Sequence, residues 1–188
     1  MVPKRMSGMT LVELLVVMMI AAILLGVGVP SFRYVTNSNR MSGEINNLLG
    51  DLQYARSEAL KEGQTVTICS ATDGKTCGTA SWDRGWIVFS DPTVAKSGAS
   101  ATNPALRSQP GFQGGDTLSF DNTVHAITFN REGFANEPLK FPPNSALTAT
   151  LHDKTANTAW SRCLVVTAGR IFTELRGPAS TTQLTECK

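Results

Sequence analysis

The chain has 188 residues, of which 41% are hydrophobic and 17% are charged, and its formal net charge is +2. This size accommodates one folded domain with an appendage. A net charge so close to zero predicts no general affinity for nucleic acid, so any anion binding would need a local cluster of basic side chains. The charges are unevenly distributed, because residues 9–29 contain a single one, Glu13. We therefore expect the two parts of the chain to lie in different solvents.

The apolar run at residues 9–29 follows a short basic segment that contains Lys4 and Arg5. As an α-helix, about 21 residues span roughly 30 Å, the thickness of the hydrocarbon core of a bilayer. The next basic residue is Arg33, so the positive-inside rule leaves the leader in the cytoplasm and the rest of the chain outside. A secretory signal peptide would need a small-residue cleavage site after the run, and residues 26–28 match one poorly. We expect a helix that spans the membrane once.

Glu13 lies inside this apolar run. A carboxylate at the centre of a bilayer costs about 2.5 to 3.5 kcal/mol on insertion scales, so Glu13 requires a positively charged partner. Residues 9–29 contain no Lys or Arg that could serve.

Gly8, residues 9–15 (MTLVELL) and Pro30 together resemble the class III leader of type IV pilins and of the pseudopilins of type II secretion. In these families a prepilin peptidase cuts after the glycine, and the new N-terminal residue is methylated. The resemblance implies cleavage between Gly8 and Met9, methylation of Met9, and pairing of Glu13 with the N-terminal amine of a neighbouring subunit. Family members usually have Phe where this chain has Met9. The mature chain would carry 15 basic and 15 acidic side chains, since both leader cations are removed.

Beyond Pro30, hydrophobic residues recur at intervals of three and four, which predicts an amphipathic helix that ends at Gly63. The whole helix is expected from Thr10 to Glu62. Its persistence should be lowered near Pro30, where two glycines and the proline occur together. Charged residues are expected on the face opposite the apolar one: Glu44, Asp51, Arg56, Glu58 and Lys61.

After Gly63 the hydrophobic period falls to two, which predicts strands. They are expected at residues 65–69, 86–89, 124–129, 147–151 and 163–166. Residues 92–116, rich in Ser, Ala, Gly and Pro, are expected to form a long loop. The predicted fold class is α+β, type IV pilin-like, with a long N-terminal helix packed on an antiparallel β-sheet or sandwich head. The expected parts are a leader (1–8), a transmembrane assembly helix (9–29), an amphipathic half-helix (30–63) and the head (64–188).

The four cysteines are an even number in a chain with a targeting segment, which suits an oxidising compartment and two disulfides. Proximity along the chain favours the pairs Cys69–Cys77 and Cys163–Cys187, although the other two pairings stay open. Each bond would contribute about 2 to 4 kcal/mol. A zinc site is disfavoured because the spacing is not C-x-x-C and no His lies near either pair. We expect no metal and no cofactor.

Several head segments resemble the FimT/FimU minor pilins, which share a head domain with GspH, the minor pseudopilin of type II secretion. The matching segments are residues 52–60, 66–70 and 85–89, with Asp73-Gly74, Cys77 and Trp82. FimU-like proteins prime pilus assembly within a tip complex. The resemblance implies an inner-membrane protein with its head in the periplasm, which joins other minor and major pilins in the pilus. A GspH-like pseudopilin of the type II secretion system is the alternative.

Some FimT-like proteins bind double-stranded DNA during natural transformation through a C-terminal Gly-Arg-x-Arg loop. Here the corresponding residues are Gly169-Arg170-Ile171-Phe172, so the second Arg of the motif is replaced by Phe172. A cluster of three or four basic residues would give weak, salt-sensitive, non-specific binding. The alternative is that they are ordinary solvated charges. The candidates are Arg162, Arg170, Arg176 and Lys188.

Motifs of enzymes are absent from the sequence: there is no G-x-S-x-G, no P-loop and no H-E-x-x-H. His125 and His152 are expected to be structural, and Asp73 and Asp83 to cap turns. We therefore expect a protein that is not an enzyme.

Overall fold

The computed structural model describes residues 9–93, 98, 104–120, 124–137, 146–155, 161–167 and 169–175. The chain divides into two units, residues 1–39 and 40–188. One helix, α1 (Leu11–Glu62), continues from the first unit into the second. Its observed bounds confirm the predicted helix to within one residue. Gly63 ends it in the left-handed conformation (φ 66°) and donates its N–H to the Ala59 carbonyl at 3.0 Å.

The first unit contains the N-terminal part of α1. Thr10 caps the helix, because the Glu13 N–H contacts the Thr10 hydroxyl oxygen at 3.3 Å and the Leu14 N–H donates to the Thr10 carbonyl at 3.2 Å. The helix is long and apolar enough to cross a membrane, judged by length and composition. It is unbroken at Pro30, although proline removes one backbone donor, so the expected loss of persistence does not end the helix.

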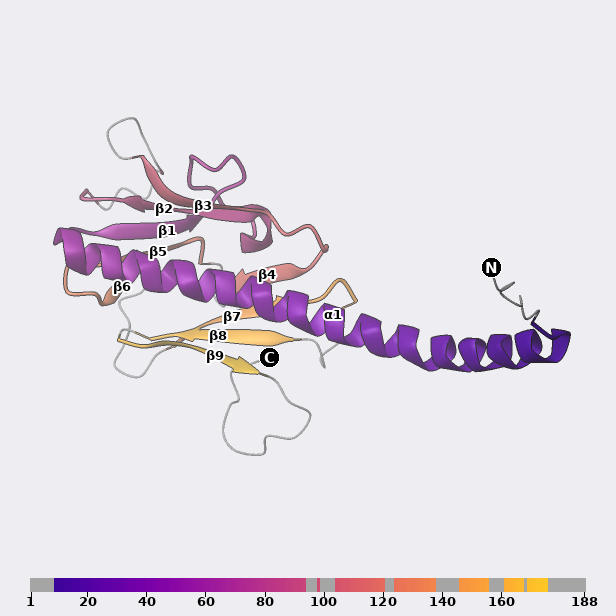
Figure 1. Cartoon of the computed structure of the whole chain (residues 1–188). Coiled ribbons are helices and arrows are strands. Elements are labelled where there is room, and N and C mark those ends of the chain that lie inside the picture. The colour runs from indigo at the N-terminus through magenta and orange to yellow at the C-terminus, as the bar shows by residue number, and fades with distance from the viewer. Residues whose placement is uncertain are drawn as a thin grey trace, which may run out of the picture. The chain divides into compact units, whose positions relative to one another are not determined.

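The second unit, which we call the head, contains two antiparallel sheets (Figure 1). The first sheet has the order β3-β2-β1-β5-β6, and the second has the order β4-β7-β8-β9. The strands of the first sheet are β1 (Val66–Ser70), β2 (Gly85–Ser90), β3 (Ala105–Pro110), β5 (Ala126–Phe129) and β6 (Ala135–Glu137). Those of the second are β4 (Thr117–Phe120), β7 (Leu147–His152), β8 (Arg162–Val166) and β9 (Ile171–Leu175). A short 3-10 helix, η1 (Trp82–Arg84), precedes β2.

All five predicted strands are confirmed, as β1, β2, β5, β7 and β8, and four others were not predicted. The expected loop at 92–116 is wrong in part, because it contains β3. This strand lies at the edge of its sheet, pairs with β2 and with no other described strand, and exposes most of its side chains. An edge strand needs no alternating apolar pattern, and its terminal Pro110 is tolerated there. The periodicity therefore gave no signal.

One face of α1 packs on both sheets, as Figure 1 shows for the part of the helix beside the head. The buried helix residues recur at intervals of three and four. They are Met41, Ile45, Leu48, Leu52, Ala55 and Ala59. The same core includes Ile68 and Trp86 of the first sheet and Leu118 and Leu164 of the second. The helix thus closes the space between the two sheets.

Asp51, expected on the charged face opposite the apolar one, is buried. Its two carboxylate oxygens accept hydrogen bonds from Trp86 Nε1 and from Arg107 Nη1, both at 2.9 Å. Arg107 also lies over the ring of Tyr54, 4.0 Å from its centroid. A carboxylate can be buried here because both oxygens have donors. Through Arg107, Asp51 ties the edge strand β3 to α1. Glu58, expected on the same charged face, is likewise buried.

The Cys69–Cys77 disulfide is present, with a Cα–Cα distance of 5.5 Å. Within its loop, the Asp73 carboxylate accepts the N–H groups of Lys75 and Thr76, each at 2.8 Å, as expected for a turn cap. Hydrogen bonds from the side chain and backbone of Thr76 lower the pKa of Asp73 to about 2. Cys163 is buried and disulfide-bonded. Its expected partner, Cys187, lies outside the described residues, so that pairing stays a prediction.

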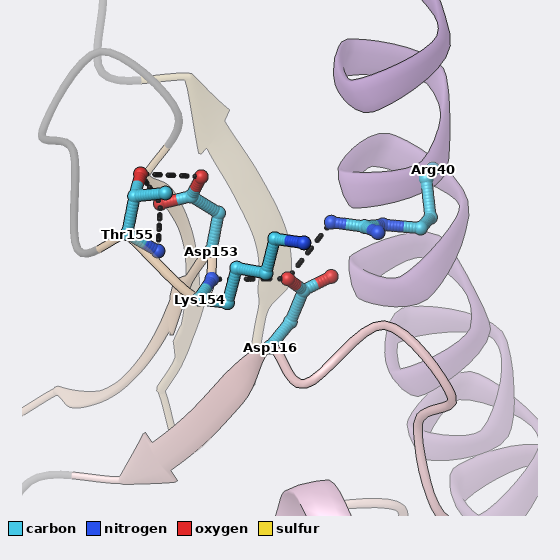
Figure 2. A network of polar contacts seen from close by, with 5 residues as sticks. All are labelled: Arg40, Asp116, Asp153, Lys154 and Thr155. Carbon is cyan, nitrogen blue, oxygen red and sulfur yellow. Dashed lines mark hydrogen bonds and ion pairs between the residues drawn. The ribbon is translucent and has the colours of Figure 1, made fainter.

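A buried polar network joins the start of the head part of α1 to the β4 and β7 regions (Figure 2). Arg40 Nη2 donates to Asp116 Oδ1 at 2.8 Å, and the Lys154 N–H contacts the same oxygen at 3.3 Å. Glu44, one turn after Arg40, is a second carboxyl that is influenced by Asp116. Burial, a hydrogen bond to Asp116 and the negative charge of Asp116 raise the pKa of Glu44 to about 7, against the opposing charge of Arg40. Near neutral pH, a fraction of Glu44 is therefore protonated.

We expect the stability of the head to fall as the pH rises from about 5 to 8. In this range the folded state binds more protons at Glu44 than the unfolded state, whose pKa is near 4.5. The resulting change in the free energy of unfolding is about 1 to 2 kcal/mol, reduced from the full linkage value because Glu44 is partly exposed. Glu44→Gln should abolish this slope, since an amide donates to Asp116 at any pH. Urea unfolding at several pH values measures it, with the exposed Glu62→Gln as control. Equal slopes in all three proteins would contradict the assignment.

Candidate functional site

The N-terminal unit contains the first group of predicted site residues. In the isolated chain the side chains of Met9 and Glu13 are exposed. Gly8 lies outside the described residues. Glu13 occupies the third position of α1, and Thr10 and Glu13 thus have the spacing of a capping box. The sequence analysis did not identify this cap, although the T-x-x-E spacing could have revealed it. The cap defines where the helix begins and so places the carboxylate within its first turn.

Apolar side chains around Glu13 are exposed throughout the membrane-length part of α1. Those more than half exposed include Leu11, Val12, Leu14, Leu15, Met18, Met19, Ile23, Leu24 and Leu25. A continuous apolar surface of this kind requires lipid or other helices to cover it. No Lys or Arg occurs in residues 9–32 to pair with Glu13. The unit is thus chemically suited to a membrane and to a partner that supplies a positive charge.

The second group of candidates lies on the β8–β9 hairpin of the head. Its turn is closed by hydrogen bonds between Thr167 and Arg170. The Thr167 N–H donates to the Arg170 carbonyl at 2.8 Å, and the Arg170 N–H donates to the Thr167 hydroxyl at 3.0 Å. The Thr167 hydroxyl in turn donates to the Arg170 carbonyl at 3.1 Å. Arg170 is exposed.

The hairpin separates two of the candidate basic residues, Arg162 and Arg170. Val166 pairs with Ile171 beside the turn, whereas Arg162 pairs with Leu175 at the other end. Four residue steps along β8 correspond to roughly 13 Å. Arg162 is also buried, and its Nη1 donates to the Ser161 carbonyl at 3.1 Å. The structure therefore does not bring Arg162 to the same patch as Arg170. Arg176 and Lys188 lie outside the described residues.

Arg56 contacts the β8–β9 turn, which no sequence pattern indicated. Its Nη1 donates to the Gly169 carbonyl at 2.8 Å, from the charged face of α1 on which Arg56 was expected. Phe134, 48% exposed, reaches the same turn from the β5–β6 side. A Cβ placed on Gly169 would lie 3.7 Å from its ring. Arg170 is thus presented by a turn that contacts both α1 and the first sheet.

The two histidines make local contacts. His125 Nδ1 lies 3.2 Å from the Ala80 carbonyl, and His152 Nδ1 lies 3.0 Å from the Ser161 hydroxyl. Ser161 is fully buried, which keeps substrates away from this serine and histidine pair. Among the described residues, no group of three or more His, Cys, Asp or Glu side chains could hold a metal ion.

Residues 44–169 match a family model described as Type II transport protein GspH, and residues 3–29 match the prokaryotic N-terminal methylation motif. No significant match was found among curated proteins.

Among solved structures, the chain is similar to the type IV minor pilin FimU of Pseudomonas aeruginosa in two crystal forms. The P21 form has a TM-score of 0.55 and 27% identity, and the match covers 74% of this chain and 92% of FimU. The P65 form has a TM-score of 0.50 and 28% identity, with coverages of 69% and 88%. The minor pseudopilin EpsH of the type 2 secretion system of Vibrio cholerae matches with a TM-score of 0.50 and 13% identity, covering 73% and 98%. That last likeness concerns the fold alone.

The GspH model covers more than half of the chain, a methylation motif precedes it, and a capped apolar helix leads into a two-sheet head. The chain therefore belongs to the GspH family and is a minor pilin or pseudopilin of the FimT/FimU/GspH type.

Proposed function

We propose that this chain is a FimU-like minor pilin that takes part in type IV pilus assembly. The observation that carries the proposal is the 27% identity to a type IV minor pilin over 92% of that protein's length, against 13% identity to the pseudopilin. Prepilin peptidase cleaves the leader after Gly8 and Met9 is methylated. The chain is held in the bacterial inner membrane with its head in the periplasm until it enters the pilus.

In this role the protein works by packing with other subunits rather than by chemistry. The exposed apolar side chains of residues 9–29 exchange lipid for the helices of other minor and major pilins. Packing alone tolerates sliding between similar apolar surfaces. Glu13 limits sliding, because its carboxylate is stable in the apolar layer only opposite a positive charge. The free amine that cleavage creates at Met9 of a neighbouring subunit supplies that charge.

Glu13→Ala should leave membrane insertion unchanged and should reduce incorporation into pili about tenfold or more, the scale of a lost charge pair of 1.4 kcal/mol or greater. Incorporation is measured by immunoblotting sheared pili against the membrane fraction. Glu13→Asp keeps the charge and is the matched control, with partial incorporation expected. Normal incorporation of the alanine variant would refute the pairing role.

The alternative is a GspH-like pseudopilin of type II secretion, which the description of the matching family model favours. A strain in which the gene for this protein is deleted distinguishes the pilus role from the secretion role. A pilus role requires loss of surface pili with normal protein secretion, and a secretion role requires the reverse. Neighbouring genes for minor pilins or for a secretion channel give the same distinction.

A further role in binding double-stranded DNA is favoured by one observation, the exposed Arg170 on a closed turn. Gel shifts with duplex DNA across a salt series test it on the head from about residue 37 onward. Binding should weaken as salt rises, and changing Arg170 and Arg176 to Gln should abolish it. Arg84→Gln, at a side chain 74% exposed on η1, removes the same charge elsewhere and should have little effect. No shift of the wild type at low salt would exclude the DNA role and leave the assembly role intact.

A further inference from the structure

We propose that Arg33 binds the phosphate groups of phospholipids at the periplasmic surface of the membrane, and that this contact sets the depth at which Glu13 lies. The proposal rests on the membrane insertion of α1 in the proposed function, and it assigns a partner to the outer end of the membrane-length segment. The partner of Arg33 is lipid, whereas the partner of Glu13 is another subunit.

Arg33 carries an isolated charge on the helix. It is the only basic residue in positions 9–39, and positions 14–43 contain no Asp or Glu that could balance it. The Arg33 side chain is exposed, and it takes part in none of the ion pairs among the described residues. A guanidinium can contact a phosphate through two parallel N–H groups, which makes phosphate a well-matched external anion.

The residues beside Arg33 are those expected where a helix leaves the hydrocarbon. In the isolated chain Phe32 and Tyr34 are 73% and 60% exposed, and Val35 is 50% exposed. The polar run 36–40 begins directly after them. Aromatic side chains are enriched at the surfaces of a membrane, and arginine extends its guanidinium to the same level. We therefore place the outer boundary of the hydrocarbon at Arg33.

The helix converts this outer boundary into a depth for Glu13. Glu13 and Arg33 are 20 positions apart in sequence, and α1 is continuous through Pro30 between them. Twenty helical residues rise about 30 Å, which is the thickness of the hydrocarbon core. With Arg33 at the outer phosphates, Glu13 lies at the cytoplasmic edge of the hydrocarbon rather than at its centre, where a carboxylate is most costly.

Arg33 opposes movement of the helix toward the cytoplasm. Cleavage after Gly8 removes Lys4 and Arg5, the cations that precede the apolar run. Before a neighbouring subunit supplies its amine, the Glu13 carboxylate is most stable in the cytoplasmic water, so it favours that movement. The movement would draw the Arg33 guanidinium away from the phosphates and into the hydrocarbon, which is costly. Arg33 thus keeps Glu13 at the depth where neighbouring helices pack.

Depth measurements in vesicles test this anchor. The mature full-length chain is reconstituted in vesicles of phosphatidylcholine and phosphatidylglycerol, with a nitroxide attached at Leu15→Cys, close to Glu13. Electron paramagnetic resonance measures the depth of the nitroxide from its contact with oxygen and with a water-soluble nickel complex. Arg33→Gln should move the label roughly 3 to 5 Å toward the cytoplasmic water, because residues 33–35 can then enter the hydrocarbon and each rises about 1.5 Å.

Two further variants of the labelled chain are the controls. Arg33→Lys keeps a cation that reaches the phosphates, so its label should stay close to the wild-type depth. Arg84→Gln removes an exposed charge from the head and should leave the depth unchanged. Equal depths in the wild type and in Arg33→Gln would overturn the proposal, while the role in pilus assembly would stand.

Bilayers of different thickness distinguish anchoring at the outer phosphates from simple centring of the helix in the membrane. A second chain carries the nitroxide at Val29→Cys, near the outer end of the apolar run. In lipids with longer acyl chains, an anchored helix keeps the Val29 label at a constant distance from the outer phosphates, and only the Leu15 label lies deeper. In Arg33→Gln both labels should lie deeper.

Equal changes at both labels in the wild type would contradict anchoring by Arg33. If both labels of the wild type were fully accessible to the nickel complex, the proposal and the membrane insertion on which it rests would both be refuted. Neither measurement depends on incorporation into pili, so a chain that failed to enter pili would still show whether Arg33 sets the depth.

Discussion

The packing of one face of α1 against both sheets is the interaction on which the head depends. The two sheets share no strand, and the buried helix residues from Met41 to Ala59 lie in one core with residues of each. Burial of apolar surface stabilises the folded state by about 25 cal/mol for each Å². The buried apolar face of α1 therefore supplies a large part of the free energy that drives folding of the head. Arg40, Asp51 and Arg56 make their contacts with the rest of the head from this helix.

Charged residues on α1 make specific contacts with strands and turns of the head. Asp51 accepts from a core tryptophan and from an edge-strand arginine, and Arg40 pairs with Asp116 beside β4. Arg56 reaches the turn between β8 and β9. Apolar packing alone fixes a helix poorly against sliding, because many similar contacts have similar energies. Hydrogen bonds to groups on four separate strands or turns restrict it to one position, and Glu44 adds a dependence on protonation.

The sequence predicted the parts of the fold that depend on local periodicity or on a known pattern. The helix, the five central strands, the Cys69–Cys77 bond and the family follow from hydrophobic spacing and from motifs within short segments. What could not be predicted depends on contacts between distant segments. The edge strand β3 has no apolar alternation. The contacts of Asp51 and Arg56 could not be predicted from the charged face of the helix, because their partners are far away in sequence. Burial of such groups is decided by the partner, which helical periodicity does not reveal.

Phe172 stands where the Gly-Arg-x-Arg motif has its second arginine, so Arg170 is the one arginine of that motif present in this chain. In the resembling motif the second arginine is two residues after the first, about 7 Å along a strand. In this chain the next arginine, Arg176, follows Leu175, and β9 places the Leu175 Cα roughly 16 Å from that of Arg170. Arg162 is buried at that same far end. Of Arg162 and Arg170, Arg170 is therefore the one that the hairpin places beside the turn.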